Sequence, residues 1–428
     1  MASTRVCLWL LFMIITQSIG EDTQSMIMSL IVDSKFQCAN TTCLPFINII
    51  TSNIRNCQVA CLTRSQCKAA TFYRSTSNCE LFDNMLNQNG NMLADVDATS
   101  MNIISGTRFP PVCSLSSQSI WSQTATTIFG SQAGTSGSTL ALLSQPGGMY
   151  YDQPNNQLIV ADMGNQRVLQ FSLNNPPSVA TVIAGGNGQG CNMNQFNIPA
   201  GVGRDSSGQL YVADYGCNQV VRFPSNSNST TSGILLGSIT LATLISIHQL
   251  TLNDDIYVVS YNDNAVYKFV GGSGSPVVAA GGNGNGNASN QLSGPNGVYY
   301  DYLYTNSLYV ADSGNNRILK FASGSTSATY GTVVAGGNGA GSGANQLNSP
   351  RSIVVDSNGT LYISDQANNR IQRWLQNANS GTTIVCGTQG AAANQLYYPE
   401  QILFDRYQNL LVADRFNNRI QLFNLTAC

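Results

Sequence analysis

The sequence contains few charged side chains and almost no histidine. Asp, Glu, Lys and Arg together make up 9% of the 428 residues, whereas a typical soluble domain contains about 25%. His248 is the single histidine. No basic cluster is present to neutralise phosphates, which disfavours nucleic-acid binding. One histidine cannot supply a zinc site with several histidine ligands, and it argues against a Ser-His-Asp catalytic set.

A long apolar run that could span a bilayer is also lacking. Val6–Ile15 is only ten residues long. With Arg5 before it and small residues ahead of Glu21, it is typical of a secretory signal over residues 1–20. Ile234–Leu252 is β-branched and interrupted by polar residues, and we interpret it as strands. We therefore expect a secreted, extracellular protein without stable membrane insertion; a retained N-terminal anchor is the alternative.

The most prominent feature of the chain is a repeated hairpin. Ser307–Phe321, SLYVADSGNNRILKF, has two apolar runs joined by a polar turn, which indicates two antiparallel strands. The residues that enter the turns of the six copies are Asp162, Asp214, Ser260, Asp312, Asp365 and Asp414. The step between copies is 46 to 53 residues, and this period indicates a propeller or a solenoid.

Each repeat contains two further strands. Gly297–Asp301 precedes the hairpin of Ser307–Phe321 and Thr332–Gly337 follows it, so that a repeat provides strands a, b, c and d. The array begins with a lone d-type strand, Thr126–Phe129, and ends with a c-type strand, Ile420–Phe423. The first strand can therefore complete the last repeat, and six four-stranded blades would form a closed ring without exposed sheet edges.

The motif VAD-x-x-N-N-R-I, with a strand ending in Asp before it and VVAGG after it, resembles the NHL-repeat family. The resemblance implies a mainly β fold, a six-bladed β-propeller over residues 125–428 whose N-terminal strand closes the last blade. It says little about activity. Two copies depart from the motif: Gln219 takes the Arg position of the second, and Ser260 and Ala265 replace Asp and Arg in the third.

Six cysteines are concentrated before the repeats. In Asn56–Phe82 two of them lie one helical turn apart, and strands are expected at Lys68–Tyr73 and around Cys79. This pattern resembles the PAN/apple family, which implies a small disulfide-rich α+β domain that binds proteins or carbohydrates without catalysis. We place this domain at residues 22–112 and a linker at 113–124. Zinc binding is the alternative for these cysteines, disfavoured by secretion and by the lack of C-x2-C pairs.

Disulfides are expected throughout a secreted chain. The PAN/apple resemblance implies the pairs Cys57–Cys79 and Cys61–Cys67, which leaves Cys38 and Cys43 for each other. In the repeats the predicted pairs are Cys191–Cys217 and Cys113–Cys428. Cys191 and Cys217 lie in neighbouring loops at one face of a blade, Cys113–Cys428 would join the two ends of the ring, and Cys386 stays unpaired. The glycosylation sequons are Asn40, Asn228, Asn287, Asn358 and Asn424.

Polar residues that repeat from blade to blade are interpreted as structural. Asp at a turn accepts backbone N–H groups, and the Arg five residues later can pair with a carboxylate of its own blade. The Gly-rich loops that begin at Gly185, Gly281 and Gly336 lack the Lys-Ser/Thr and helix of a phosphate site and the closely spaced Asp of a calcium repeat. We interpret them as flexible connections between blades.

Ligand specificity should instead come from positions that differ between blades. In this topology the d–a and b–c loops share one face. We predict that five residues in these loops ring the mouth of the central channel and contact a ligand: Arg351, Glu400, Arg415, Tyr215 and Asn296. The alternative is that Arg351 and Glu400 form a surface ion pair of little energetic weight.

The sequence therefore predicts a secreted, non-catalytic recognition protein. It would bind an extracellular protein or glycan through the PAN/apple-like domain and one face of the propeller, with no cofactor, no metal and no nucleic-acid partner. Two alternatives remain open. One is a propeller hydrolase or lyase that uses a calcium ion in the channel, and the other is a structural matrix component that associates with itself.

Overall fold

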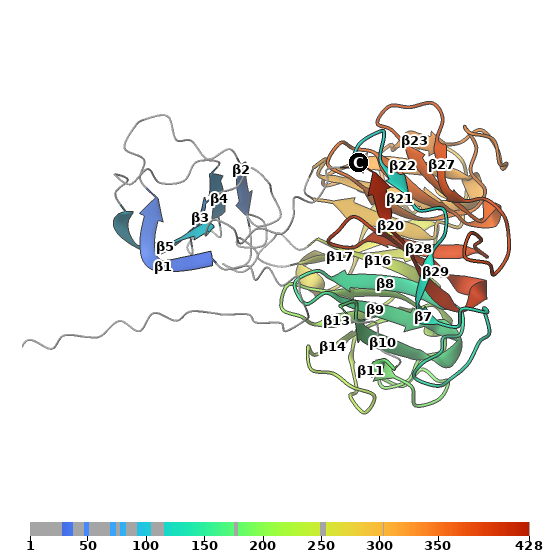
Figure 1. The fold of residues 1–428 in the computed structure, drawn as a ribbon, viewed down its shortest axis with the longest axis horizontal. Coiled ribbons are helices and arrows are strands. Elements are labelled where there is room, and N and C mark those ends of the chain that lie inside the picture. Colours follow the sequence, from blue (N-terminus) through green and yellow to red (C-terminus); the bar gives the residue numbers. More distant parts are fainter. Residues whose placement is uncertain are drawn as a thin grey trace, which may run out of the picture. The chain divides into compact units, whose positions relative to one another are not determined.

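The computed structural model describes residues 115–427, with gaps at 175–178, 249–253 and 303, and five strands nearer the N-terminus. The chain divides into two compact units, Met1–Val112 and Cys113–Cys428 (Figure 1). No helix in the described part of the chain is long and apolar enough to cross a bilayer. The predicted signal segment 1–20 lies outside the described residues, as does Asn40.

The N-terminal unit contains one antiparallel sheet with the strand order β1-β5-β3-β4-β2. Its strands are β1 (Met28–Phe36), β2 (Ile47–Ile50), β3 (Ala69–Tyr73), β4 (Asn78–Phe82) and β5 (Met92–Ile103). β3 and β4 are the two strands predicted around the cysteine-rich segment. The predicted helix between residues 56 and 67 and the predicted bonds among Cys38, Cys43, Cys57, Cys61, Cys67 and Cys79 lie outside what the structure describes.

The C-terminal unit is a propeller of six four-stranded antiparallel sheets, the blades. Blades 1 to 3 contain β8 (Pro146–Asp152), β9 (Gln157–Asp162), β10 (Arg167–Ser172) and β11 (Thr181–Gly185); β12 (Pro199–Arg204), β13 (Leu210–Asp214), β14 (Gln219–Phe223) and β15 (Ile234–Ser238); and β16 (Ala242–His248), β17 (Asp255–Ser260), β18 (Ala265–Phe269) and β19 (Val277–Gly281).

Blades 4 to 6 contain β20 (Gly297–Asp301), β21 (Ser307–Asp312), β22 (Arg317–Ala322) and β23 (Thr332–Gly336); β24 (Pro350–Val355), β25 (Leu361–Asp365), β26 (Arg370–Trp374) and β27 (Thr382–Cys386); and β28 (Pro399–Phe404), β29 (Leu410–Asp414), β30 (Arg419–Phe423) and β7 (Thr126–Gly130). The first strands of consecutive blades contact each other, and β28 contacts β8. These six strands therefore surround the central channel.

The ring closes as the sequence predicts. β7 pairs with β30 in antiparallel register, with Phe129 opposite Ile420, and Figure 1 shows teal β7 among the red strands of the last blade. One strand from the beginning of the propeller segment thus completes the blade formed by its end. β7 thereby pairs with the edge of β30 that would otherwise be free.

The b strands are buried on both faces because each blade is covered by a neighbour on either side. Leu158 and Val160 of β9 pack into a cluster with Leu411 of blade 6, whereas Ile159 and Ala161 pack into a cluster with blade 2. Successive residues of a strand point to opposite faces. A continuous apolar run in a b strand therefore fills two inter-blade cores at once.

Part of the predicted linker at 113–124 belongs to the propeller instead. β6 (Ile120–Trp121) pairs with β31 (Leu425–Ala427). The Trp121 ring is 1% exposed, packs against Tyr362 and Phe404, and donates its Nε1–H to the Gln408 carbonyl at 3.0 Å. The prediction was wrong for residues 115–124 because this short strand pairs with a partner at the far end of the chain.

In five blades the b–c turn contains a short 3-10 helix. These helices are η1 (Met163–Asn165), η2 (Tyr215–Cys217), η4 (Ser313–Asn315), η5 (Gln366–Asn368) and η6 (Arg415–Asn417); η3 (Val270–Gly272) instead follows β18. A residue in the left-handed region follows each of the five, for example Asn316 with φ 54°. Asn adopts this conformation more readily than most residues, which accounts for the repeated Asn before strand c.

Candidate functional site

In four of the six blades a buried ion pair joins the b–c turn to the d–a loop that enters the same blade. In blade 4, Oδ2 of the fully buried Asp312 accepts hydrogen bonds from Arg317 Nε at 2.7 Å and from Asn315 Nδ2 at 2.8 Å, and Oδ1 accepts the Ser293 N–H. The other guanidinium nitrogens of Arg317 donate to the carbonyls of Asn287, Ala288 and Gln291. We call this arrangement of Asp, Asn and Arg the loop lock.

The loop lock recurs in three further blades. The ion pairs are Arg167–Asp162 at 2.7 Å in blade 1, Arg370–Asp365 at 2.7 Å in blade 5 and Arg419–Asp414 at 2.8 Å in blade 6. The predicted pairing of Arg with a carboxylate of its own blade is confirmed. Because the guanidinium and carboxylate groups of the lock are buried and hydrogen-bonded to the turn and to the adjoining loops, these repeated residues hold the scaffold and leave little capacity for a ligand.

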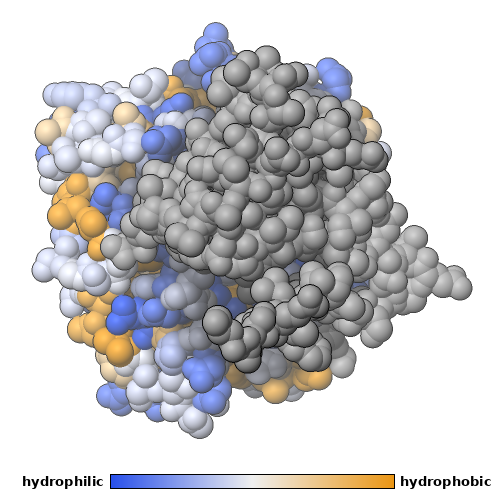
Figure 2. Space-filling model, turned by 90° about the vertical axis from the view of Figure 1, so that its left-hand side faces the viewer, coloured by the Kyte–Doolittle hydropathy of each residue, from blue (hydrophilic) through white to orange (hydrophobic). Residues whose placement is uncertain are grey.

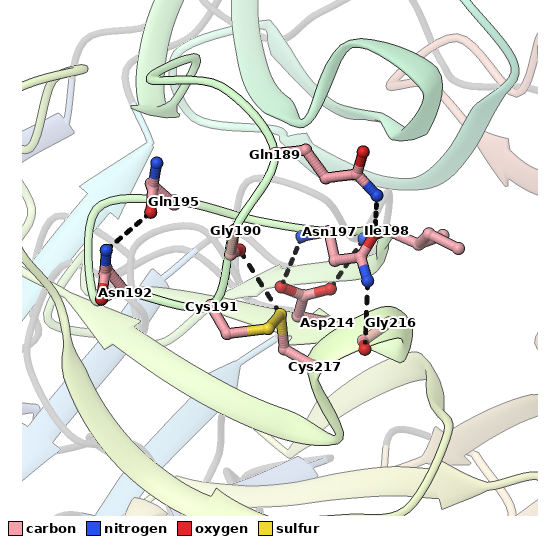
Figure 3. The surroundings of a disulfide bond; sticks show 10 residues. All are labelled: Gln189, Gly190, Cys191, Asn192, Gln195, Asn197, Ile198, Asp214, Gly216 and Cys217. Carbon is pink, nitrogen blue, oxygen red and sulfur yellow. Dashed lines mark hydrogen bonds between the residues drawn. A yellow bond between two sulfur atoms is a disulfide. The ribbon is translucent and has the colours of Figure 1, made fainter.

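In blade 2 a disulfide takes the place of the lock. Cys217 occupies the Asn position and bonds Cys191 in the d–a loop, with 5.5 Å between their Cα atoms, which confirms the predicted pair (Figure 3). Asp214 keeps its place and accepts the N–H groups of Asn197 and Ile198. Burial raises the pKa of Asp214, and the backbone N–H bonds oppose this shift. The disulfide thus joins the d–a loop to the b–c turn in blade 2, as the arginine does in the blades that have the loop lock.

Blade 3 has neither device. Its d–a loop consists of residues 239–241 only, between β15 and β16. Ser260 donates its hydroxyl to the Thr240 carbonyl at 2.6 Å. A loop this short needs no clamp, which explains why Ser and Ala are tolerated at the Asp and Arg positions.

The long Gly-rich d–a loops are ordered connectors. Each buries one large side chain that forms an isolated bridge across the loop, such as Leu292 opposite Asn285 and Leu347 opposite Ala340. Asn283 donates its side-chain amide to the carbonyl of Asn290 in its own loop and to that of Ser327 in the c–d loop of blade 4. These loops connect blades, as predicted, but they are not the flexible connections that we expected from their glycines, because the buried side chain and the hydrogen bonds fix each loop.

The remaining cysteine predictions have different outcomes. Cys386 is unpaired and half-buried, and burial raises the pKa of its thiol to about 12. It has φ 59° at the position where blades 1, 3 and 4 have glycine. Cys113 and Cys428 lie outside the described residues, so their bond stays a prediction.

Three of the five predicted ligand residues lie together at the channel mouth. Arg351 is the second residue of β24, Glu400 is the second residue of β28, and Arg415 begins η6. Arg415 Nη1 donates to Glu400 Oε2 at 3.2 Å, and Arg351 Nη1 lies 3.8 Å from Glu400 Oε1. We call this group, together with Gln366, the mouth network.

Gln366 was missed as a ligand candidate although it stands at the same turn position as Arg415. Its Nε2–H donates to Glu400 at 2.7 Å, and its Oε1 accepts Arg351 Nε at 2.9 Å. Glu400 is 5% exposed and Gln366 1%. These two buried side chains thus fix two arginines that remain about one-fifth exposed, with two positive charges against one negative.

Tyr215 and Asn296 do not join the mouth network in the described structure. Tyr215 begins η2 in blade 2 and donates its backbone N–H to the Ile198 carbonyl. Asn296 is 3% exposed, and its carbonyl accepts the Thr243 hydroxyl. Both lie in blades other than those that provide the network, because each blade contributes to a different sector of the ring.

The mouth is asymmetric. Blades 5 and 6 provide Arg351 and Glu400, whereas blades 1 and 2 have Gly147 and Ala200 at the corresponding positions. A Cβ added to Gly147 would lie 2.9 Å from Met163 Sδ and 3.0 Å from the Ala200 carbonyl oxygen. The charged side chains therefore gather at blades 5 and 6, whereas blades 1 and 2, which follow them around the ring, contribute small residues at these positions.

No metal cluster is visible in the described ranges: no group of three or more His, Cys, Asp or Glu lies close enough together to hold an ion. The sequons Asn228, Asn287, Asn358 and Asn424 are exposed. Their glycosylation stays a prediction.

Comparison with known proteins agrees with the architecture. The PAN domain profile matches residues 34–104, and the NHL repeat profile matches residues 143–171 and 347–374. The chain therefore carries a PAN domain followed by an NHL-repeat, six-bladed β-propeller, and this combination points to protein binding. No curated protein matches the sequence significantly.

Several solved structures share the propeller. A protein of unknown function from Bacteroides thetaiotaomicron is 13% identical, with 84% of this chain and 90% of that chain covered and a TM-score of 0.55. An auxiliary nutrient binding protein from Bacteroides ovatus is 12% identical, with 84% and 91% covered and a TM-score of 0.53. A gluconolactonase from Xanthomonas campestris is 12% identical, with 73% and 98% covered and a TM-score of 0.49. At these identities the likeness concerns the fold.

Proposed function

We propose that this protein is a secreted, non-catalytic recognition protein whose propeller mouth binds an acidic group of an extracellular protein ligand. The observation that carries the proposal is the mouth network, in which the buried Glu400 and Gln366 hold the partly exposed Arg351 and Arg415. Unlike the loop lock, this network is not repeated around the ring. A non-repeated, preorganised cationic group is what selective binding of a carboxylate requires.

The charge balance supports an acidic ligand group. One carboxylate serves two guanidinium groups, so the network has a net charge of +1 and spare N–H donors. Arg binds carboxylates through two parallel hydrogen bonds, which gives direction as well as affinity. The PAN domain supplies a second binding module on the same chain, and two modules that engage one ligand raise the overall affinity through their high effective concentration.

The proposal is tested with the mature protein and a panel of extracellular proteins, measured by surface plasmon resonance. Arg351→Ala with Arg415→Ala should abolish or strongly weaken binding, and wild-type binding should weaken as the salt concentration rises. Lys268→Ala is the matched control, because Lys268 also forms a partly exposed ion pair, with Asp255 at 3.2 Å, but at the other end of its blade. A ligand that binds the double variant and the wild type equally would refute the mouth as its site.

A second measurement addresses catalysis. Elemental analysis of the purified protein should find no stoichiometric metal. Stoichiometric calcium would instead favour a hydrolase or lyase that acts in the channel, and self-association without any ligand would favour a matrix component.

A further inference from the structure

A groove of about 630 Å³ lies between blades 4 and 5, at the other end of the blades from the mouth network. It is lined by the start of β21, the end of β22, the a–b turn of blade 5 and the c–d loops of both blades. In an antiparallel blade these segments share the face opposite to the b–c turns. The groove is therefore separate from the proposed mouth site, and its size is in the range of small-ligand sites.

One wall of the groove offers an exposed aromatic ring. Tyr330 lies in the c–d loop of blade 4 and is 72% exposed, and Val333 beside it is 43% exposed. Tyr330 is the only aromatic residue among the c–d loops of blades 1 to 5. The corresponding position is valine in blade 1 (Val179) and serine in blades 2, 3 and 5, so the repeat does not require an aromatic ring here. A ligand with an apolar face could pack on this ring.

The other wall offers side-chain amides. Gln376, Asn377 and Asn379 line the groove from the c–d loop of blade 5, and their side chains make no hydrogen bond with another residue of the described chain. Each amide can both donate and accept. The lining contains no Asp, Glu or Arg, and its one cation, Lys320, lies with its ammonium group 5.6 Å from the centre of the Tyr309 ring. The groove is therefore suited to an uncharged, hydroxyl-rich ligand.

We infer that this groove binds a neutral oligosaccharide. A pyranose ring presents C–H groups on one face and hydroxyl groups around its edge, which fits a wall with an exposed tyrosine opposite a wall of free amides. Lys320 is the one residue of the lining that would attract a sulfated or carboxylated sugar. An acidic protein segment fits the two arginines of the mouth network better than it fits this groove. The inference concerns a second site and does not depend on the proposed protein ligand.

The test is an array of neutral oligosaccharides that lack sialic acid and sulfate, followed by calorimetric titration of the member that binds best. N-glycans are first removed enzymatically from the protein, because the sequon Asn358 adjoins Gly359 on the wall of the groove. We expect Tyr330→Ala to weaken binding by at least about tenfold and Tyr330→Phe to keep most of it. Tyr407→Ala is the matched control, since Tyr407 is 48% exposed in an a–b turn of blade 6.

Two results would overturn the inference. One is an array on which the deglycosylated protein binds no neutral oligosaccharide. The other is a titration in which Tyr330→Ala binds as tightly as Tyr407→Ala. If oligosaccharide binding is lost in the Arg351→Ala, Arg415→Ala variant and kept in Tyr330→Ala, the groove fails as a site while the mouth proposal stands.

Discussion

Blades 2 and 4 attach the d–a loop to the b–c turn by different chemistry. Both must hold a long Gly-rich loop against the turn between strands b and c. Blade 4 uses the buried Arg317 and Asp312 with the partly buried Asn315, all hydrogen-bonded, whereas blade 2 places Cys217 at the Asn position and bonds it to Cys191. The comparison shows that a long d–a loop has to be joined to the b–c turn, and that either an ion pair or a disulfide can do this. Blade 3, whose loop is three residues long, has neither device.

The largest effect is expected from removal of the cation in blade 4. Arg317→Ala leaves Asp312 buried without its ionic partner and three loop carbonyls without a donor, which should cost about 3–5 kcal/mol in the free energy of unfolding. Denaturant titration followed by tryptophan fluorescence measures this for the propeller, because Trp121 and Trp374 are the tryptophans outside the predicted signal. Arg317→Ala with Asp312→Asn should be less unstable than Arg317→Ala alone; equal or greater instability would contradict the role given to the buried charge.

Breaking the disulfide of blade 2 should have the next largest effect. Cys191→Ser with Cys217→Ser opens a bond between residues 26 apart in the sequence, which should cost about 2–4 kcal/mol. The same denaturant titration, compared with the oxidised wild-type protein, gives the difference, and the reduced wild type serves as the control that should match the variant. A midpoint unchanged from the oxidised wild type would show that the loop is held by its backbone bonds to Asp214.

Rebuilding the ionic lock in blade 2 tests whether the two devices are interchangeable. Cys191→Asn, Cys217→Asn and Gln219→Arg together restore the residues of blade 4, and should recover about 1–2 kcal/mol relative to the double serine variant. Asp214 is already in place to accept the guanidinium group. The triple variant with Gln219→Lys is the control, because an ammonium group cannot reach the three loop carbonyls as a fork.

The smallest effect on stability is expected at the channel mouth. Arg351→Ala should change the free energy of unfolding by no more than about 1 kcal/mol, because its pair with Glu400 spans 3.8 Å and Arg351 is partly exposed. Together with the Arg317 result this would separate arginines that hold the scaffold from arginines available to a ligand. A loss as large as that of Arg317→Ala would make the mouth network structural and remove the main support for the proposed function.

How far the sequence predicts this protein differs between its parts. The blades, the ring closure by Thr126–Gly130 and the Cys191–Cys217 bond follow from repeat spacing and from the rule that neighbouring loops share a face. The packing of Trp121 did not follow, since its partner strand Leu425–Ala427 is about 300 residues away in the chain. Gln366 was overlooked for a similar reason: its neighbours Arg351 and Glu400 come from two different blades.

The exposed hydrophobic residues also required the structure. The coloured part of Figure 2 shows hydrophobic residues in small separate groups among hydrophilic ones. Ile234 and Val277 begin the outer strands β15 and β19 and are exposed as Tyr330 is, and only the residues around Tyr330 show that it borders a groove. A pattern of alternating apolar residues gives no indication that one of them borders a groove.

The amino-acid sequence by itself determined the number of blades, their four-stranded order and the ring, because period, alternation and turn chemistry are local properties of the chain. Only the tertiary structure decided which polar side chains share a hydrogen bond, which loop needs a clamp and where a groove opens. These depend on distances between blades, and the side chains that meet there come from repeats some fifty residues apart.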